Sequence, residues 1–154
     1  MTLHFAYGSN LSRALMRARC PSAKEIGTAV LDDHRFVITA DGYASITPRR
    51  GAVVHGALWR LTSRDLAALN AYENIASGLY RVWVLPVRVA GRRVTALVYI
   101  ARSRAHGRPK PAYLDLIIAA ARDWRLPENY VEQLARWNAV SHRAAPTSDL
   151  GEIA

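Results

Sequence analysis

The sequence predicts a single α+β domain built on a closed or strongly curved mixed β-sheet with flanking helices. Strand-like runs outnumber helical ones, and they do not alternate with helices as they would in a parallel βαβ protein. The 154 residues are one domain's worth of chain. With 51% apolar and 21% charged residues, the composition is typical of a globular protein.

The first expected strand runs from Leu3 to Tyr7 and stops at the turn Gly8-Ser9-Asn10. Glycine adopts backbone angles that are closed to other residues, and Ser or Asn can cap a helix. We therefore expect a helix to follow this turn directly. It is expected to run to Cys20, because Pro21 ends it.

A hairpin is expected next, from strand-like runs at 34–40 and 43–47. They flank Asp41-Gly42, a dipeptide that favours a tight turn. A third, separate run at 53–61 contains Gly56, which indicates a bulge or the close approach of another backbone.

The middle of the chain predicts a short helix and then a second pair of strands. Thr62 or Ser63 is expected to cap the helix, which ends near Glu73. The segment 79–89 is apolar on both alternating faces, so we expect it to be buried from both sides. A glycine turn then leads into a further strand at 94–100.

The C-terminal part predicts two helices that pack on the outside of the sheet. The first is expected at 112–124, and the second has Pro127 at its first position, where proline is favoured. Residues 141–154 have little to bury, and we expect them to form a flexible tail of the 1–154 domain.

Composition narrows the class of protein. Cys20 is the only cysteine, so an internal disulfide is excluded, and no signal-peptide pattern precedes the first strand. The longest strictly apolar stretch, 116–121, is far shorter than the roughly 20 residues that a membrane helix needs. We therefore expect a cytoplasmic protein that does not cross a membrane. The five histidines lack metal-ligand spacing, so no metal is expected.

The formal charge of +9 raises the question of nucleic acid. Basic residues attract phosphate chains, and the stretch 74–113 contains eight basic residues and no acid. The basic residues are nevertheless spread over strands and turns rather than along one helix stripe. We favour an arginine-rich, solvated surface, and we retain only a preference for anionic ligands.

Two features could carry chemistry. At 7–11, Tyr-Gly-Ser-Asn-Leu ends a strand in a turn whose backbone N–H groups can cradle an anion at a helix start, although such turns often serve capping alone. Glu73, at a helix end, is followed by forty positions without another acid and can carry protons if the fold turns it inward. Most glutamates in loops are simply solvated. Cys20 is expected to be a small buried residue.

The chain resembles the γ-glutamylcyclotransferases, whose signature is Tyr-Gly-Ser-Asn-Leu near the N-terminus with an essential glutamate in mid-chain. The signature is complete at 7–11, and the likeness continues in order and spacing to about Trp137. The matching blocks are 54–59, Glu73, 77–80, 111–113 and 126–130. One departure is Asn74, where many relatives have glycine.

The resemblance implies an enzyme of the acyltransferase or lyase type that needs no cofactor. It would convert a γ-glutamyl amide or peptide into 5-oxoproline and a free amine, with Glu73 as general acid/base. The implied substrate-binding residues are Tyr7, Gly8, Ser9, Asn10, Leu11, Tyr80 and Tyr113. For each of the last two tyrosines, core packing is the alternative role. The identity of the amine and the oligomeric state are left open, and so is a non-catalytic module that binds an anionic metabolite or nucleic acid.

Overall fold

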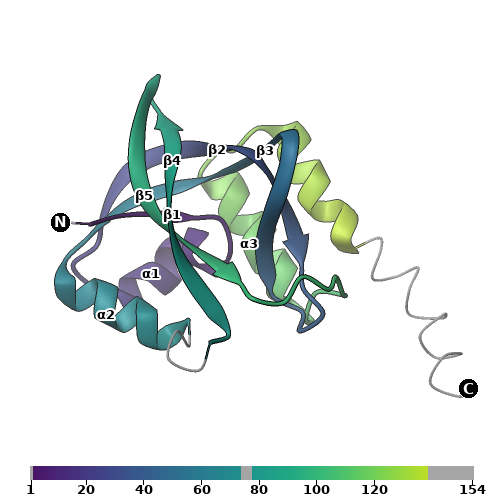
Figure 1. Cartoon of the computed structure of the whole chain (residues 1–154), viewed down its shortest axis with the longest axis horizontal. Helices are drawn as coiled ribbons and strands as arrows, with labels where there is room; N and C mark the ends of the chain where they lie inside the picture. Colours follow the sequence, from purple (N-terminus) through teal and green to yellow (C-terminus); the bar gives the residue numbers. More distant parts are fainter. Residues whose placement is uncertain (1, 74–77, 139–154) are drawn as a thin grey trace, which may run out of the picture.

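The computed structural model describes residues 2–73 and 78–138, which form a closed, five-stranded barrel with helices on its outside (Figure 1). The strand order is β1-β3-β2-β4-β5. β1 pairs with β5 in parallel, and the other paired neighbours are antiparallel, so the sheet is mixed, as predicted. The strands are β1 (Thr2–Ala6), β2 (Lys24–Ile38), β3 (Ala44–Leu61), β4 (Tyr80–Val89) and β5 (Arg92–Ala101).

The β2–β3 hairpin is longer than the sequence predicted. Its turn lies at Asp41-Gly42, as expected, and Gly42 has a φ of 89°. The predicted break near 48–52 is wrong, because β3 continues through it. The extra residues are accommodated as an irregularity in the register, where Asp32 pairs with Val53 and His34 pairs with Pro48. The first half of β2, residues 24–33, was not predicted as a strand.

Gly56 lies where two backbones approach closely, which confirms one of its two predicted roles. A Cβ at this position would lie 2.2 Å from the carbonyl oxygen of Ala6. Residues 2–6 of β1 pair with residues 57–61 of β3. The absence of a side chain at Gly56 therefore lets the end of β1, which leads into the Tyr7–Leu11 turn, lie against β3.

The helices are η1 (Ser9–Leu11), α1 (Arg13–Arg19), α2 (Ser63–Tyr72) and α3 (Tyr113–Asp123), and residues 128–138 are also helical. The prediction that α1 begins directly at the turn is wrong by two residues. A single 3₁₀ turn comes first, and Ser12 then caps α1 by accepting from Leu15 N–H at 3.2 Å. Thr62 caps α2 in a reciprocal capping box with Asp65. Pro127 directly precedes the last helix, one residue before its predicted place at the first helical position, and its carbonyl accepts from Tyr130 and Val131.

Two side chains fix the Tyr7–Leu11 turn against α3. The indole N–H of Trp124 donates to the Leu11 carbonyl at 2.8 Å. The Arg13 guanidinium lies over the Trp124 ring, 3.7 Å from its centroid, and pairs with Glu25 and Asp123. The turn is therefore attached to the barrel by β1 and to the helical layer by Trp124.

The prediction that 79–89 is buried from both sides is wrong. Trp83 is 47% exposed and Val84 is 59% exposed. β4 pairs with β5 along its whole length but with β2 only where Val30 meets Arg88, so most of this hairpin diverges from the rest of the barrel. Its apolar side chains are consequently covered on one side at most. No helix in the described ranges is long and apolar enough to cross a bilayer.

Candidate active site

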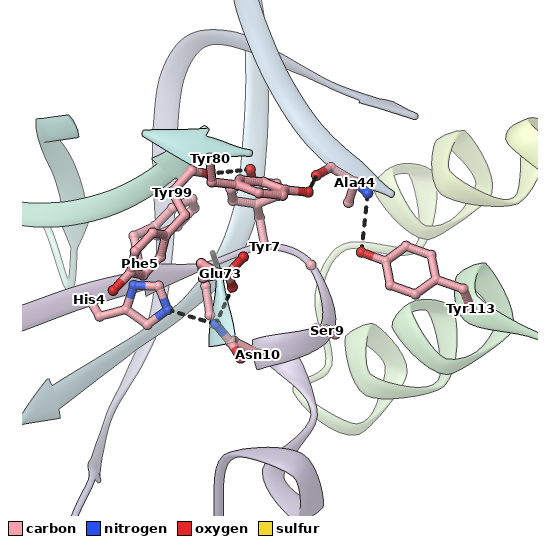
Figure 2. Close-up of a pocket in the computed structure, with 12 residues that line it drawn as sticks. His4, Phe5, Tyr7, Ser9, Asn10, Ala44, Glu73, Tyr80, Tyr99 and Tyr113 are labelled. Atoms are coloured by element: carbon pink, nitrogen blue, oxygen red, sulfur yellow. Dashed lines mark hydrogen bonds between the residues drawn. The ribbon is translucent and has the colours of Figure 1, made fainter. Parts of the chain in front are cut away.

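A cavity lies where the end of β1 meets the C-terminal end of α2 (Figure 2). Segments distant in the sequence contribute to it: the Tyr7–Leu11 turn, the start of β3, the start of β4, β5 and the start of α3. Its volume is about 40 Å³. The lining residues are His4, Phe5, Ala6, Tyr7, Gly8, Ser9, Asn10, Ala44, Glu73, Tyr80, Tyr99 and Tyr113.

Glu73 points into this cavity. It is the C-cap residue of α2, and its backbone N–H donates to the Leu69 carbonyl at 2.8 Å. One of its carboxyl oxygens, Oε1, accepts a hydrogen bond from the Asn10 side-chain amide at 3.3 Å. Burial raises the pKa of Glu73 to about 7, against the opposing effects of the Arg19 charge and the Asn10 hydrogen bond. Near neutral pH, this carboxyl can therefore both accept and donate a proton.

The Tyr7–Leu11 turn faces the same cavity with part of its backbone. Leu11 N–H donates to the Gly8 carbonyl and Ser12 N–H to the Ser9 carbonyl, both at 3.0 Å. No acceptor in residues 2–73 and 78–138 takes the N–H of Ser9 or Asn10. An anion was predicted to bind the N–H groups of Gly8–Leu11. The Leu11 N–H is used within the turn, so the N–H groups that remain for an anion are the first ones of the 3₁₀ turn.

Leu11 is placed differently from the other predicted binding residues. Its side chain is 1% exposed and packs in the hydrophobic core, and it is not one of the residues that line the cavity. Its N–H is also used within the turn. Leu11 therefore anchors the turn rather than facing a ligand.

Four tyrosines line the cavity, and the hydroxyls of Tyr7, Tyr80 and Tyr113 are bonded in different ways. Tyr7 donates to the Tyr99 carbonyl, and Tyr80 donates to the Ala44 carbonyl at 2.6 Å. Tyr113 instead accepts from Ala44 N–H at 3.1 Å. Because its oxygen is the acceptor, the Tyr113 hydroxyl keeps its own proton for a ligand. Burial raises the pKa of Tyr113 to about 12 and that of Tyr7 and Tyr80 further, so all three are neutral at pH 7.

A second, wider hollow of about 240 Å³ adjoins the cavity. It shares Ser9, Glu73, Tyr80 and Tyr113 with the cavity and adds Tyr43, Tyr72 and Leu79. The added side chains are at least partly exposed. A ligand held at Glu73 can therefore extend outward between aromatic rings.

Sequence reasoning missed Arg19, His4 and Tyr99. Arg19 donates to Ser9 Oγ at 2.9 Å and Asn10 Oδ1 at 2.6 Å, and its guanidinium stacks on Tyr72 at 3.6 Å from the ring centroid. Arg19 lies nine residues beyond Asn10, on a helix whose rotation could not be fixed from periodicity. Asn74 and Ser77 lie outside the described residues.

The described residues contain no group of three or more His, Cys, Asp or Glu side chains arranged to hold a metal ion. Cys20 is buried and hydrogen-bonds to the Asp65 carbonyl at 3.5 Å. Burial raises the pKa of its thiol to about 11, so it is a packing residue rather than a nucleophile.

Comparison with known proteins decides the family. The profile of the AIG2-like family matches residues 53–134, and a mouse protein named gamma-glutamylcyclotransferase is 30% identical over 98% of this chain and 86% of its own length. The chain belongs to the γ-glutamylcyclotransferase family. The human protein of that name is 31% identical over 86% of this chain and 76% of its own.

Solved structures agree with this assignment. A structure named gamma-glutamyl cyclotransferase superposes with a TM-score of 0.81 at 29% identity, and covers 86% of this chain and 85% of its own. The prediction from the Tyr-Gly-Ser-Asn-Leu signature is confirmed at the level of family and fold. This protein is a γ-glutamylcyclotransferase-like enzyme.

Proposed function

We propose that this γ-glutamylcyclotransferase-like enzyme converts a γ-glutamyl amide or peptide into 5-oxoproline and the free amine, with Glu73 as the general acid/base. The observation that carries the proposal is a carboxyl group, buried enough to have a pKa of about 7, that lines one cavity together with Ser9 and Asn10 and accepts from the Asn10 side-chain amide. The names of the mouse and human relatives point to the same reaction class.

The reaction is an intramolecular aminolysis in which no external group is consumed. The α-nitrogen of the γ-glutamyl group forms a bond to its own γ-carbonyl carbon, which closes a five-membered lactam. The bond between that carbon and the outgoing nitrogen breaks. Glu73 takes a proton from the attacking nitrogen and returns it to the outgoing nitrogen, so the carboxylate is regenerated.

Positioning is the main contribution of the cavity. The two reacting groups already belong to one molecule, so holding the glutamyl chain folded back exploits effective molarities that reach about 10⁵ to 10⁸ M in well-oriented systems. We assign the N–H groups of Ser9 and Asn10 to the substrate α-carboxylate or to the oxyanion of the tetrahedral intermediate. Tyr113 supplies a hydroxyl proton near Gly8, and Tyr7 and Tyr80 form the walls.

The outgoing amine is assigned to the wider hollow. Glu73 borders both spaces, so it can reach the nitrogen that leaves as well as the nitrogen that attacks. Tyr43 and Tyr72 flank the path that this amine takes outward.

The test is product formation. Purified protein is incubated with a panel of γ-glutamyl compounds whose amines are an amino acid, a peptide or a polyamine, and 5-oxoproline is measured by mass spectrometry. Release of 5-oxoproline together with an equal amount of amine supports the proposal. Binding of panel members without release would instead support a non-catalytic binding module on this fold.

A further inference from the structure

His4 and Asn10 are buried polar residues that line the cavity together with Glu73 (Figure 2). His4 is 2% exposed and Asn10 is 5% exposed. Burying polar groups costs free energy unless their hydrogen bonds are satisfied, so the partners of these two side chains are informative.

Both the oxygen and the nitrogen of the Asn10 side-chain amide form hydrogen bonds. Its oxygen, Oδ1, accepts from the Arg19 guanidinium at 2.6 Å, and its nitrogen, Nδ2, donates to Glu73 Oε1 at 3.3 Å. Nδ2 also lies 3.4 Å from Nε2 of His4. The reversed amide would turn its NH₂ group toward a guanidinium and its oxygen toward a carboxyl group. Arg19 therefore favours the orientation in which the NH₂ group faces Glu73.

His4 is held in one tautomer by the backbone of β5. Its Nδ1 lies 3.2 Å from the Leu97 carbonyl oxygen, which can only accept, so Nδ1 carries the proton. Nε2 then presents a lone pair to Asn10 Nδ2. Burial lowers the pKa of His4 to about 4, which keeps the ring neutral and Nε2 an acceptor at neutral pH.

We propose that His4 is a positioning residue: its Nε2 accepts from the Asn10 amide and, together with Arg19, aims that amide at the Glu73 carboxyl. This role rests on the proposed cyclisation for its kinetic consequence. His4 acts through Asn10, because the nitrogen of Asn10 joins the two side chains.

The expected consequence is that Asn10 and Arg19 adjust the pKa of Glu73, the proposed proton carrier. The Asn10 hydrogen bond and the Arg19 charge hold the pKa of Glu73 below the value that burial alone would give. The other titratable groups that line the cavity are neutral near pH 7 and come from β1, the turn after it, β4, β5 and α3: His4, Tyr7, Tyr80, Tyr99 and Tyr113. Loosening Asn10 should therefore raise the pKa of Glu73 further.

The test compares His4→Phe, His4→Gln, Asn10→Ala and the double variant His4→Phe/Asn10→Ala. Phe keeps a ring but removes the acceptor, whereas Gln can donate to Leu97 and accept from Asn10. We expect kcat to fall about 10-fold in His4→Phe and about 10- to 100-fold in Asn10→Ala, since small misplacements of a reacting group cost this much. His4→Gln should recover most of the kcat that His4→Phe loses. The acidic limb of the pH–rate profile should move to higher pH in His4→Phe and in Asn10→Ala.

The double variant separates positioning from a merely structural role. If His4 acts through Asn10, the double variant is no slower than Asn10→Ala, within about twofold. Multiplied losses, an unchanged pH profile or no rescue by Gln would overturn the proposal.

A second readout does not depend on turnover. The carboxyl carbons of the five glutamates are labelled with ¹³C, and the Glu73 signal is assigned by its loss in Glu73→Gln. Its pKa should rise in His4→Phe and return in His4→Gln, and an unchanged pKa would reject the role of His4. If wild-type protein releases no 5-oxoproline, the reaction is wrong, but this titration still decides whether His4 positions Asn10.

Discussion

Asn10 donates its side-chain amide to the carboxyl of Glu73, 63 positions further along the chain. The bond joins the turn after β1 to the end of α2. It brings the two halves of the Tyr-Gly-Ser-Asn-Leu and mid-chain glutamate pattern into one cavity. The proposed proton transfer by Glu73, for a substrate held by this turn, depends on this juxtaposition.

The pH dependence of kcat/KM should report Glu73. The base must be ionised, and its pKa is raised to about 7, so kcat/KM should rise tenfold per pH unit below this value and level off above it. Initial rates of 5-oxoproline release between pH 5 and 9 measure this. An acidic midpoint near 4.5, the value for an unperturbed glutamate, would contradict the buried state of the carboxyl.

The same burial should make Glu73 a cost to stability at higher pH. Its folded pKa of about 7 lies above the unfolded value of 4.5, so the folded state binds more protons and stability falls as pH rises through this window. We expect Glu73→Gln to be more stable than wild type at pH 8, by on the order of 2 to 3 kcal/mol, and to lose this advantage near pH 4.5. Urea unfolding at both pH values measures the difference, and an equal difference at the two values would refute it.

Tyr113→Phe should weaken substrate binding and should also destabilise the fold. The substitution removes a hydroxyl group that lines the cavity and leaves Ala44 N–H without its acceptor, which costs about 1 to 3 kcal/mol of stability. We expect kcat/KM to fall about 10-fold, the usual effect of losing one hydrogen bond of about 1.4 kcal/mol. Tyr130→Phe is the matched control, because Tyr130 is buried but does not line the cavity, and its kinetics should not change.

Gly56→Ala should disrupt the junction that places the turn. The added Cβ would lie 2.2 Å from a backbone oxygen of β1, which cannot move as a flexible side chain can. We expect a loss of several kcal/mol, at or above the usual 1 to 3 kcal/mol for overpacking, in thermal or urea unfolding. Gly91→Ala is the control: nothing lies within 4 Å of its new Cβ, so only its φ of 75° is penalised. Equal losses in both variants would show that the close approach is unimportant.

The dependence on salt concentration should distinguish a cyclising enzyme from a nucleic-acid-binding protein of the same charge. Cyclisation of a small zwitterion should change little between 50 and 200 mM salt. Binding through about 6 to 10 phosphate contacts would weaken by about 10³ to 10⁵ over the same range. Parallel measurements of turnover and of oligonucleotide binding check this. Tight, salt-sensitive oligonucleotide binding without turnover would favour a nucleic-acid-binding protein over the enzyme.

Local chemistry predicted the parts of the fold that depend on a few neighbouring residues. The Asp41-Gly42 turn and the Thr62 cap each follow from short-range backbone preferences, and both are confirmed. The start of the last helix was predicted to within one residue, since the helix begins at Glu128, directly after Pro127. The close approach at Gly56 was one of two options that the strand glycine offered, and the Ala6 backbone decides it.

The errors have a different origin. An apolar run such as 79–89 indicates burial only if another layer covers it, and the divergence of β4 from β2 is a property of the whole barrel. The β2–β3 hairpin continues past 48–52 because a bulge absorbs the extra residues, which periodicity cannot reveal. Arg19 and His4 were missed because their roles depend on which side chains the fold places beside Asn10.

The most direct measurement is 5-oxoproline release by Glu73→Gln, beside wild type and a Glu128→Gln control whose exposed carboxyl lies on the last helix. We expect Glu73→Gln to keep the fold and to lose about 10²- to 10⁴-fold in kcat, the usual contribution of general acid–base catalysis, and we expect Glu128→Gln to be unchanged. Wild-type turnover in folded Glu73→Gln would contradict this expectation, because proton transfer would then belong to another group.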